Sequence, residues 1–171
     1  MSIDYSHAPH AWEKEKGNFV ALLDLKLESI EHGKAVMRMP FRPEITNGTG
    51  AVHGGAIVSL CDTVFYCALA SIFGREQETT TSSLQCNFLR PALPPHDLIA
   101  EARVLKAGRR IVYGEVYVRS GEKIVAHATL NFLNSYDHER PPGSHSKWPI
   151  GPSTTLRSAQ DDKDDSRRDD S

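Results

Sequence analysis

The sequence of residues 53–71 is HGGAIVSLCDTVFYCALAS. After its two glycines this stretch contains no further glycine or proline, and it is apolar on nearly every side. A run of this length and pattern is typical of a helix that is buried all round. We therefore expect a long helix from Gly54 to about Ser71, with the rest of the domain packed around it.

Four runs after this helix alternate between apolar and polar residues, as strands with one buried face do. They are Thr80–Leu89, Leu98–Lys106, Arg110–Val118 and Lys123–Leu133. The turns between them are Pro91–Asp97, Ala107-Gly108 and Ser120-Gly121-Glu122. Consecutive strands joined by short turns predict an antiparallel meander.

The segment before the long helix predicts a short helix and a hairpin. A helical pattern covers Ala11–Leu23, and the strand patterns Leu25–Ser29 and Lys34–Met39 flank the turn residues Glu31-His32-Gly33. Residues 40–50 form a loop rich in proline and glycine. Together these patterns predict an α+β fold, in which a curled antiparallel sheet of about five to six strands wraps a long central helix.

The composition changes near Tyr136, which sets the expected domain boundaries. Residues 137–171 are rich in proline, serine, aspartate and arginine and contain few aliphatic side chains. Such a segment buries too little apolar area to offset its ordering entropy, so we expect a disordered polar tail. We expect residues 19–136 to form one domain and residues 1–18 to form an N-terminal segment with a short helix.

The overall composition excludes several function classes. A net charge of −2 offers no electrostatic footprint for nucleic acid, and no apolar run approaches the ~20 residues that a membrane helix needs. The polar N-terminus lacks an apolar signal segment, so we expect a cytoplasmic protein. We interpret Cys61, Cys67 and Cys86 as reduced core residues. The histidines show no ligand spacing, so we expect no metal site.

Asp62 is the main candidate for chemistry, because aspartate is a poor helix former in the middle of a helix. A carboxylate among apolar neighbours must be hydrogen-bonded or shifted in pKa. The alternative is an aspartate on a narrow solvated stripe with Ser59 and Tyr66, for which a wholly apolar helix has little room. We therefore favour a functional carboxylate that lines a cleft, either as a general base or as a nucleophile.

Gly54 and Gly55 open the predicted helix. A helix N-terminus presents unpaired N–H groups, and glycines let a substrate approach them closely, which suits an oxyanion on a carbonyl substrate. The alternative is that the glycines only permit tight packing. Eight positions separate Gly54 from Asp62, or roughly 12 Å along one helix. Two antiparallel helices from different subunits would bring the two groups together, so we expect a composite site and at least a dimer.

The segment Asn47–Asp62 resembles the signature of hotdog-fold thioesterases of the phenylacetate-pathway type. That signature is an Asn, then His-Gly-Gly opening the central helix, then an Asp nine positions after the His. Phe88-Leu-Arg-Pro91 is similar to the end of the family's third strand, and the resemblance covers roughly Phe19 to Asn134. It implies the hotdog fold, hydrolysis of acyl-coenzyme A (acyl-CoA) and no cofactor.

The resemblance also implies roles for single residues. Gly54 would polarise the thioester carbonyl through its N–H, and Asp62 of the facing subunit would be the base or nucleophile. Asn47 and His53 would position water or the thioester, unless they are ordinary turn residues. Thr81 would hold a water molecule, although nearby hydroxyl residues leave this choice open; they are Thr79, Thr80, Ser82 and Ser83.

Substrate contacts are the least specific predictions. We expect Gly55 near the substrate and Val64 and Phe65 in the acyl pocket, together with Leu69 and Phe88. Basic side chains can bind the phosphates of coenzyme A or can be plain surface charge; they are Arg90, Lys106, Arg109 and Arg110.

Other functions stay open at this point. A non-catalytic acyl-CoA sensor would keep the pocket but would not need Asp62. A hotdog hydratase or dehydratase would need an acidic partner for its histidine, and the two corresponding positions hold Gly48 and Cys67. The acyl group, the choice between coenzyme A and acyl carrier protein, and the choice between dimer and tetramer are not determined by these patterns.

Overall fold

The computed structural model describes residues 19–73 and 79–134. The predicted helical residues before Phe19 and the predicted polar tail lie outside the described residues. The described helices are α2 (Phe19–Leu22), η2 (Pro43–Ile45) and α3 (Gly54–Phe73). The strands are β1 (Lys26–Glu31), β2 (Lys34–Met39), β3 (Thr79–Phe88), β4 (Leu98–Ala107), β5 (Ile111–Ser120) and β6 (Lys123–Asn134). These elements confirm the predicted α+β class.

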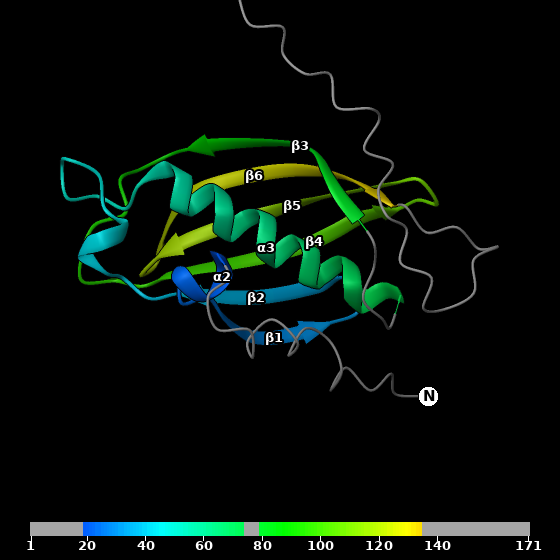
Figure 1. Ribbon diagram of the computed structural model, residues 1–171, viewed down its shortest axis with the longest axis horizontal. Helices are drawn as coiled ribbons and strands as arrows, with labels where there is room; N and C mark the ends of the chain where they lie inside the picture. The colour runs from blue at the N-terminus through cyan, green and yellow to red at the C-terminus, as the bar shows by residue number, and fades with distance from the viewer. Residues whose placement is uncertain (1–18, 74–78, 135–171) are drawn as a thin grey trace, which may run out of the picture. The chain divides into compact units, whose positions relative to one another are not determined.

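The strands form one antiparallel sheet of six strands in the order β1-β2-β4-β5-β6-β3 (Figure 1). Strands β4, β5 and β6 follow one another as the predicted meander. The meander prediction is wrong for β3, which pairs with β6 at the edge of the sheet and not with β4. The connection over residues 89–97 explains the difference, because nine residues can reach ~30 Å while three strand spacings need only ~14 Å.

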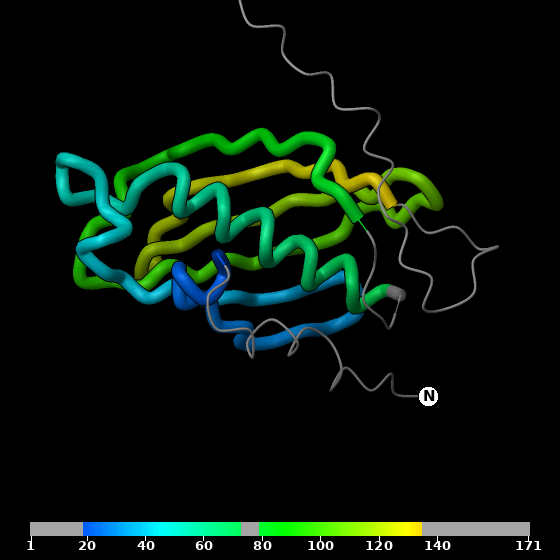
Figure 2. Tube along the Cα trace, in the orientation of Figure 1, coloured from blue at the N-terminus to red at the C-terminus, as the bar shows by residue number. Residues whose placement is uncertain are grey.

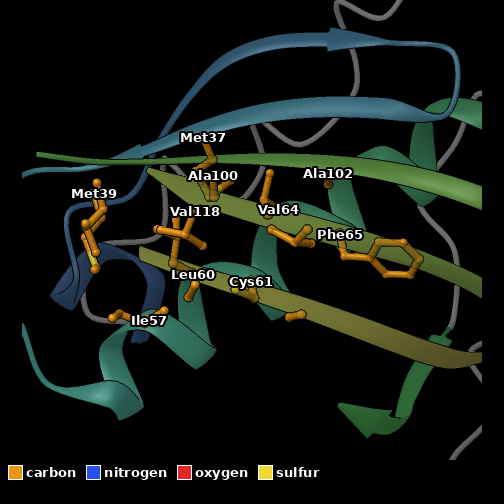
Figure 3. Packing of buried hydrophobic residues seen from close by; sticks show 14 of the residues in the cluster. Met37, Met39, Ile57, Leu60, Cys61, Val64, Phe65, Ala100, Ala102 and Val118 are labelled. Atoms are coloured by element: carbon orange, nitrogen blue, oxygen red, sulfur yellow. The ribbon is translucent and has the colours of Figure 1, made fainter. Parts of the chain in front are cut away.

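Helix α3 lies across one face of the curved sheet and packs mainly on β2, β4 and β5 (Figures 1 and 2). Its core-facing side chains are fully buried between the helix and the sheet (Figure 3); they include Leu60, Cys61, Val64, Phe65 and Leu69. The ring of Phe65 packs against Phe132, with the ring centroids 5.2 Å apart. By length and composition alone, Gly54–Ile72 would be apolar enough to cross a membrane. The expectation that no apolar run approaches that length is therefore wrong, but here this segment is the core helix.

Gly114 on β5 explains how closely α3 approaches the sheet. A Cβ atom at this position would overlap both the ring of Phe65 and the backbone carbonyl of Arg103. A glycine therefore leaves the space that the Phe65 ring occupies.

The prediction that the central helix is buried all round is only partly correct. The opposite side of α3 carries a half-buried stripe, whose members are Val58, Ser59, Asp62, Thr63 and Tyr66. Their spacing of three and four positions places them on one helical face. The solvated stripe that the sequence disfavoured is therefore present in the protomer, and Asp62 lies on it.

Candidate active site

Asp62 connects the central helix to the edge strand. The Thr81 hydroxyl on β3 donates a hydrogen bond of 2.7 Å to Asp62 Oδ1 on α3. Burial raises the pKa of the Asp62 carboxyl above its ordinary value, and the bond from Thr81 lowers it in part. The structure therefore brings together two of the predicted site residues, Asp62 and Thr81. Thr81 bonds only one of the two carboxylate oxygens, Oδ1.

A pocket of about 300 Å³ lies beside this pair. It is lined by residues of α2, α3, β3 and β6, which are Val20, Asp62, Thr63, Tyr66, Thr79, Thr81 and Phe132. The lining is mostly apolar, and Asp62 is the acidic residue among these seven. Such a pocket can hold an apolar group next to a base or nucleophile.

Several of these lining residues were not predicted. Thr63 and Tyr66 stand one and four positions after Asp62, so helical spacing could have identified them as neighbours on the same face. Thr79 was considered only as an alternative to Thr81. Val20 and Phe132 come from distant parts of the chain, and no local pattern marks them as pocket residues.

The N-terminus of α3 is held by His53. Its Nδ1 accepts a hydrogen bond of 2.9 Å from the Gly55 N–H, and its backbone carbonyl accepts from Ala56 and Ile57. This is an N-cap, in which a side chain satisfies one of the unpaired N–H groups of the first turn. No acceptor within residues 19–73 and 79–134 pairs with the Gly54 N–H. The cap thus occupies the Gly55 donor and leaves the Gly54 donor for another acceptor.

Phe88 lies against Gly54. A Cβ atom at Gly54 would be 3.0 Å from Phe88 Cζ, and the Phe88 side chain is 54% exposed. Phe88 is therefore at the helix N-terminus and does not line the pocket beside Asp62.

In the protomer, Val64 and Phe65, which were predicted as acyl contacts, do not reach the pocket beside Asp62. Both side chains are completely buried in the hydrophobic core, because their positions on α3 face the sheet. Neither they nor Leu69 line the pocket. The neighbouring positions 63 and 66 face it in their place.

Asn47 lies in an exposed turn. Its Oδ1 accepts hydrogen bonds from the N–H and the hydroxyl of Thr49, at 2.9 and 2.7 Å. Within the protomer Asn47 therefore acts as an ordinary turn residue, which was the alternative prediction. It does not contact Asp62 there.

The predicted phosphate-binding arginines lie on the surface. Arg90 donates a hydrogen bond of 2.8 Å to the carbonyl of Ile124, while Arg109 and Arg110 are exposed between β4 and β5. None of the three lines the pocket, and their contact with coenzyme A stays a prediction. Among the described residues, no cluster of three or more His, Cys, Asp or Glu side chains could hold a metal ion.

Comparison with known proteins matches residues 49–133 to the thioesterase superfamily. The acyl-coenzyme A thioesterase PaaI of Escherichia coli is 32% identical over 105 residues, which cover 61% of this chain and 73% of the relative. The solved structure of the E. coli PaaI protein is 25% identical, covers 76% of this chain and 91% of its own, and has a TM-score of 0.68. A conserved protein of Pseudomonas aeruginosa, PA5202, is 32% identical, covers 72% and 98%, and has a TM-score of 0.67. These matches confirm the predicted hotdog fold.

Proposed function

The chain belongs to the thioesterase superfamily and is a thioester hydrolase, and from this premise we propose that it hydrolyses acyl-CoA to the free acid and coenzyme A. In this proposal Asp62 is the general base or the nucleophile. The Gly54 N–H of a second subunit stabilises the oxyanion. The position of the Asp62 carboxylate in an apolar pocket, held by Thr81, is the observation that carries the proposal.

The environment of Asp62 suits either role. A carboxyl whose pKa is raised by burial is a stronger base once it is ionised than a carboxyl in water. Thr81 fixes one carboxylate oxygen and thereby orients the other. Orientation by a further group is typical of a positioned base or nucleophile.

The Gly54 N–H suits an oxyanion donor. It sits at the positive end of a long helix, where a developing negative charge is stabilised. The Phe88 ring lies where a side chain of residue 54 would be, and with glycine here a thioester carbonyl can approach the N–H closely. Because His53 caps the Gly55 N–H, we assign to His53 a positioning role through the helix end.

Two features of the protomer support a second copy across the site. The stripe on α3 that carries Asp62 is only half-buried, although it includes Val58 and Tyr66. Strand β3 stands at the sheet edge, and most of its residues are exposed. Unpaired edges and half-buried apolar faces are where protein subunits associate. An antiparallel arrangement of two α3 helices would place each Gly54 near the other subunit's Asp62, which one helix cannot do.

The reaction then follows from these groups. As a base, Asp62 removes a proton from water, and the resulting hydroxide attacks the thioester carbon. The Gly54 N–H of the second subunit stabilises the oxyanion, the carbon–sulfur bond breaks, and coenzyme A leaves as its thiol after taking up the proton. As a nucleophile, Asp62 attacks the same carbon, the carbon–sulfur bond breaks and an anhydride forms. Water then hydrolyses the anhydride, which releases the acid, restores the Asp62 carboxylate and supplies the proton that the coenzyme A thiolate takes up. A cytoplasmic location and the absence of a cofactor stay predictions.

The test is release of free thiol from a panel of acyl-CoA esters by the wild type and the Asp62→Ala variant. We expect kcat to fall by at least ~10²-fold, the scale expected for removing a positioned base or nucleophile. Glu101→Ala is the matched control, because this carboxylate is exposed on β4 away from the pocket. Mass photometry of each variant records whether the dimer survives.

Three results would contradict parts of the proposal. Equal turnover by Asp62→Ala would remove Asp62 from the chemistry. Binding of every ester without turnover by the wild type would favour the sensor. A fully active monomer would exclude a site shared between subunits.

A further inference from the structure

The pocket beside Asp62 has one wall that belongs neither to the central helix nor to the sheet. This wall is Val20 of α2, a helix of only four residues. All other lining residues come from α3, β3 and β6. The shape of the pocket at α2 therefore depends on how one short segment is held in place.

Val20 is anchored by the backbone that follows it. The Leu25 N–H donates to the Val20 carbonyl at 3.2 Å, and the Leu23 and Leu25 side chains are buried in the core. The Arg42 guanidinium donates a 2.6 Å hydrogen bond to the carbonyl of Leu22. These contacts fix α2 at its C-terminal end.

Of the four side chains of α2, Val20 is half-buried and the other three, Ala21 among them, are exposed. Val20 packs against the core cluster. Phe19 and Leu22 are 59% and 66% exposed. Val20 therefore contributes an apolar wall, while Leu22 offers a position on the same helix that does not line the pocket.

The pocket is small and has a polar and an apolar part. Its volume of about 300 Å³ is roughly twice that of an apolar cavity that binds benzene, which is about 150 Å³. Asp62 and Thr81 supply the polar part, and Val20, Tyr66 and Phe132 supply the apolar part. With the thioester carbon at Asp62, an acyl group that extends toward α2 meets the Val20 side chain.

We propose that Val20 is a specificity-determining residue that closes the acyl subsite at α2 and limits the size of the acyl group. This inference rests on the proposed function and adds a substrate class to it, namely esters of compact acyl groups. It assigns selectivity to a residue outside the segment that matches the thioesterase superfamily. A purely structural Val20 would affect stability but would not change the preference among acyl groups.

The experiment compares wild type, Val20→Trp, Val20→Ala and the control Leu22→Trp on straight-chain CoA esters from acetyl to palmitoyl. For Val20→Trp, we expect the ratio of kcat/KM for octanoyl to that for acetyl to fall about tenfold or more, since one methylene misfit in a pocket costs about 10- to 200-fold. For Val20→Ala we expect the preferred chain length to increase. Leu22→Trp should keep the wild-type profile, and a melting curve checks that each variant is folded.

The outcomes separate this inference from the proposed function. If the wild type hydrolyses none of the esters, the proposed function fails and the acyl subsite fails with it. If the wild type hydrolyses them but Val20→Trp lowers every chain length equally, the thioesterase stands and the role of Val20 is overturned. The role of Val20 is also overturned if Leu22→Trp changes the profile as strongly as Val20→Trp.

Discussion

The two faces of α3 differ although their residues alternate along one helix. The face toward the sheet is fully buried and entirely packed, as Phe65 against Gly114 illustrates. The other face is half-buried and carries the Asp62 carboxylate. Both faces have apolar neighbours in sequence, so composition alone does not separate them.

This difference separates stability from chemistry within a few residues. Packed side chains on the sheet face stabilise the fold. Removing one is costly because the surrounding core is close-packed and relaxes only partly into the cavity. On the other face, the desolvated carboxylate gains basicity at the expense of folding free energy. Phe65→Ala and Asp62→Asn, one turn apart, should therefore have opposite effects on stability, and three experiments test how the two faces differ.

The largest expected effect is on the sheet face. Phe65→Ala should lower the free energy of unfolding by about 3–5 kcal/mol, because the ring is fully buried and its removal leaves a cavity. Tyr66→Ala, on the half-buried face, is the matched comparison and should cost clearly less. Urea denaturation of both variants measures the two losses. Equal losses would show that the two faces are packed alike.

The sequence was sufficient to predict the central helix and the strands, but it did not predict every pair of neighbouring strands in the sheet. The sequence predicted the first residue of α3, Gly54, and both ends of strand β2 as the structure has them. Both elements carry strong local signals. Pairing of β3 with β6 was missed, since the pairing partner of an edge strand is a tertiary choice that strand periodicity does not encode.

The candidate site was predicted to a similar degree. Asp62 was identified as a polar residue in an apolar run. Thr81 was assigned a water-holding role through the resemblance, and the structure joins it to Asp62 by a hydrogen bond that was not predicted. Val64 and Phe65 were predicted to line a pocket and are buried in the core, because a helix expected to be buried all round offers no rule for choosing a face. The polar residues Ser59, Asp62 and Thr63 carried that information. Val20 could not be identified, because only the tertiary fold brings α2 to the pocket.

A smaller effect is expected at the hydrogen bond from Thr81 to Asp62, which joins the edge strand to the half-buried face of α3. Thr81→Val keeps the shape of the side chain but removes the donor, so the pKa of Asp62 should rise further. If ionised Asp62 is the active form, the acid limb of the kcat/KM profile moves to higher pH. On the acid limb we expect kcat/KM to fall about tenfold or more, since a hydrogen bond to a charged group contributes about 1.5–3 kcal/mol.

Thr81→Ser is the control for this substitution, because serine retains the hydroxyl. Its pH profile should stay close to that of the wild type. If Thr81→Val leaves the acid limb unchanged, either Asp62 does not titrate in the rate-determining step or the bond does not affect it. If serine and valine shift the profile equally, the hydroxyl is not the cause.

The smallest expected effect is a gain in stability from Asp62→Asn. Burial raises the pKa of Asp62 in the folded chain above its unfolded value, so the folded state holds the proton more strongly between these two values. Stability therefore falls as pH rises through this interval, and the penalty is complete above the folded pKa. Asparagine removes the charge and can still accept the bond from Thr81, so the variant should escape the penalty.

The size of this gain is limited because solvent screens a carboxylate that is only partly buried. At neutral pH we expect Tm of Asp62→Asn to rise by roughly 2 °C, since about 1 kcal/mol corresponds to 2–4 °C in a chain of this size. Below the ordinary Asp pKa of about 3.9 the difference should vanish. Differential scanning calorimetry at both pH values measures it. A lower Tm for Asp62→Asn at neutral pH would mean that the ionised carboxylate stabilises the fold, so that Asp62 would contribute to stability as Phe65 does.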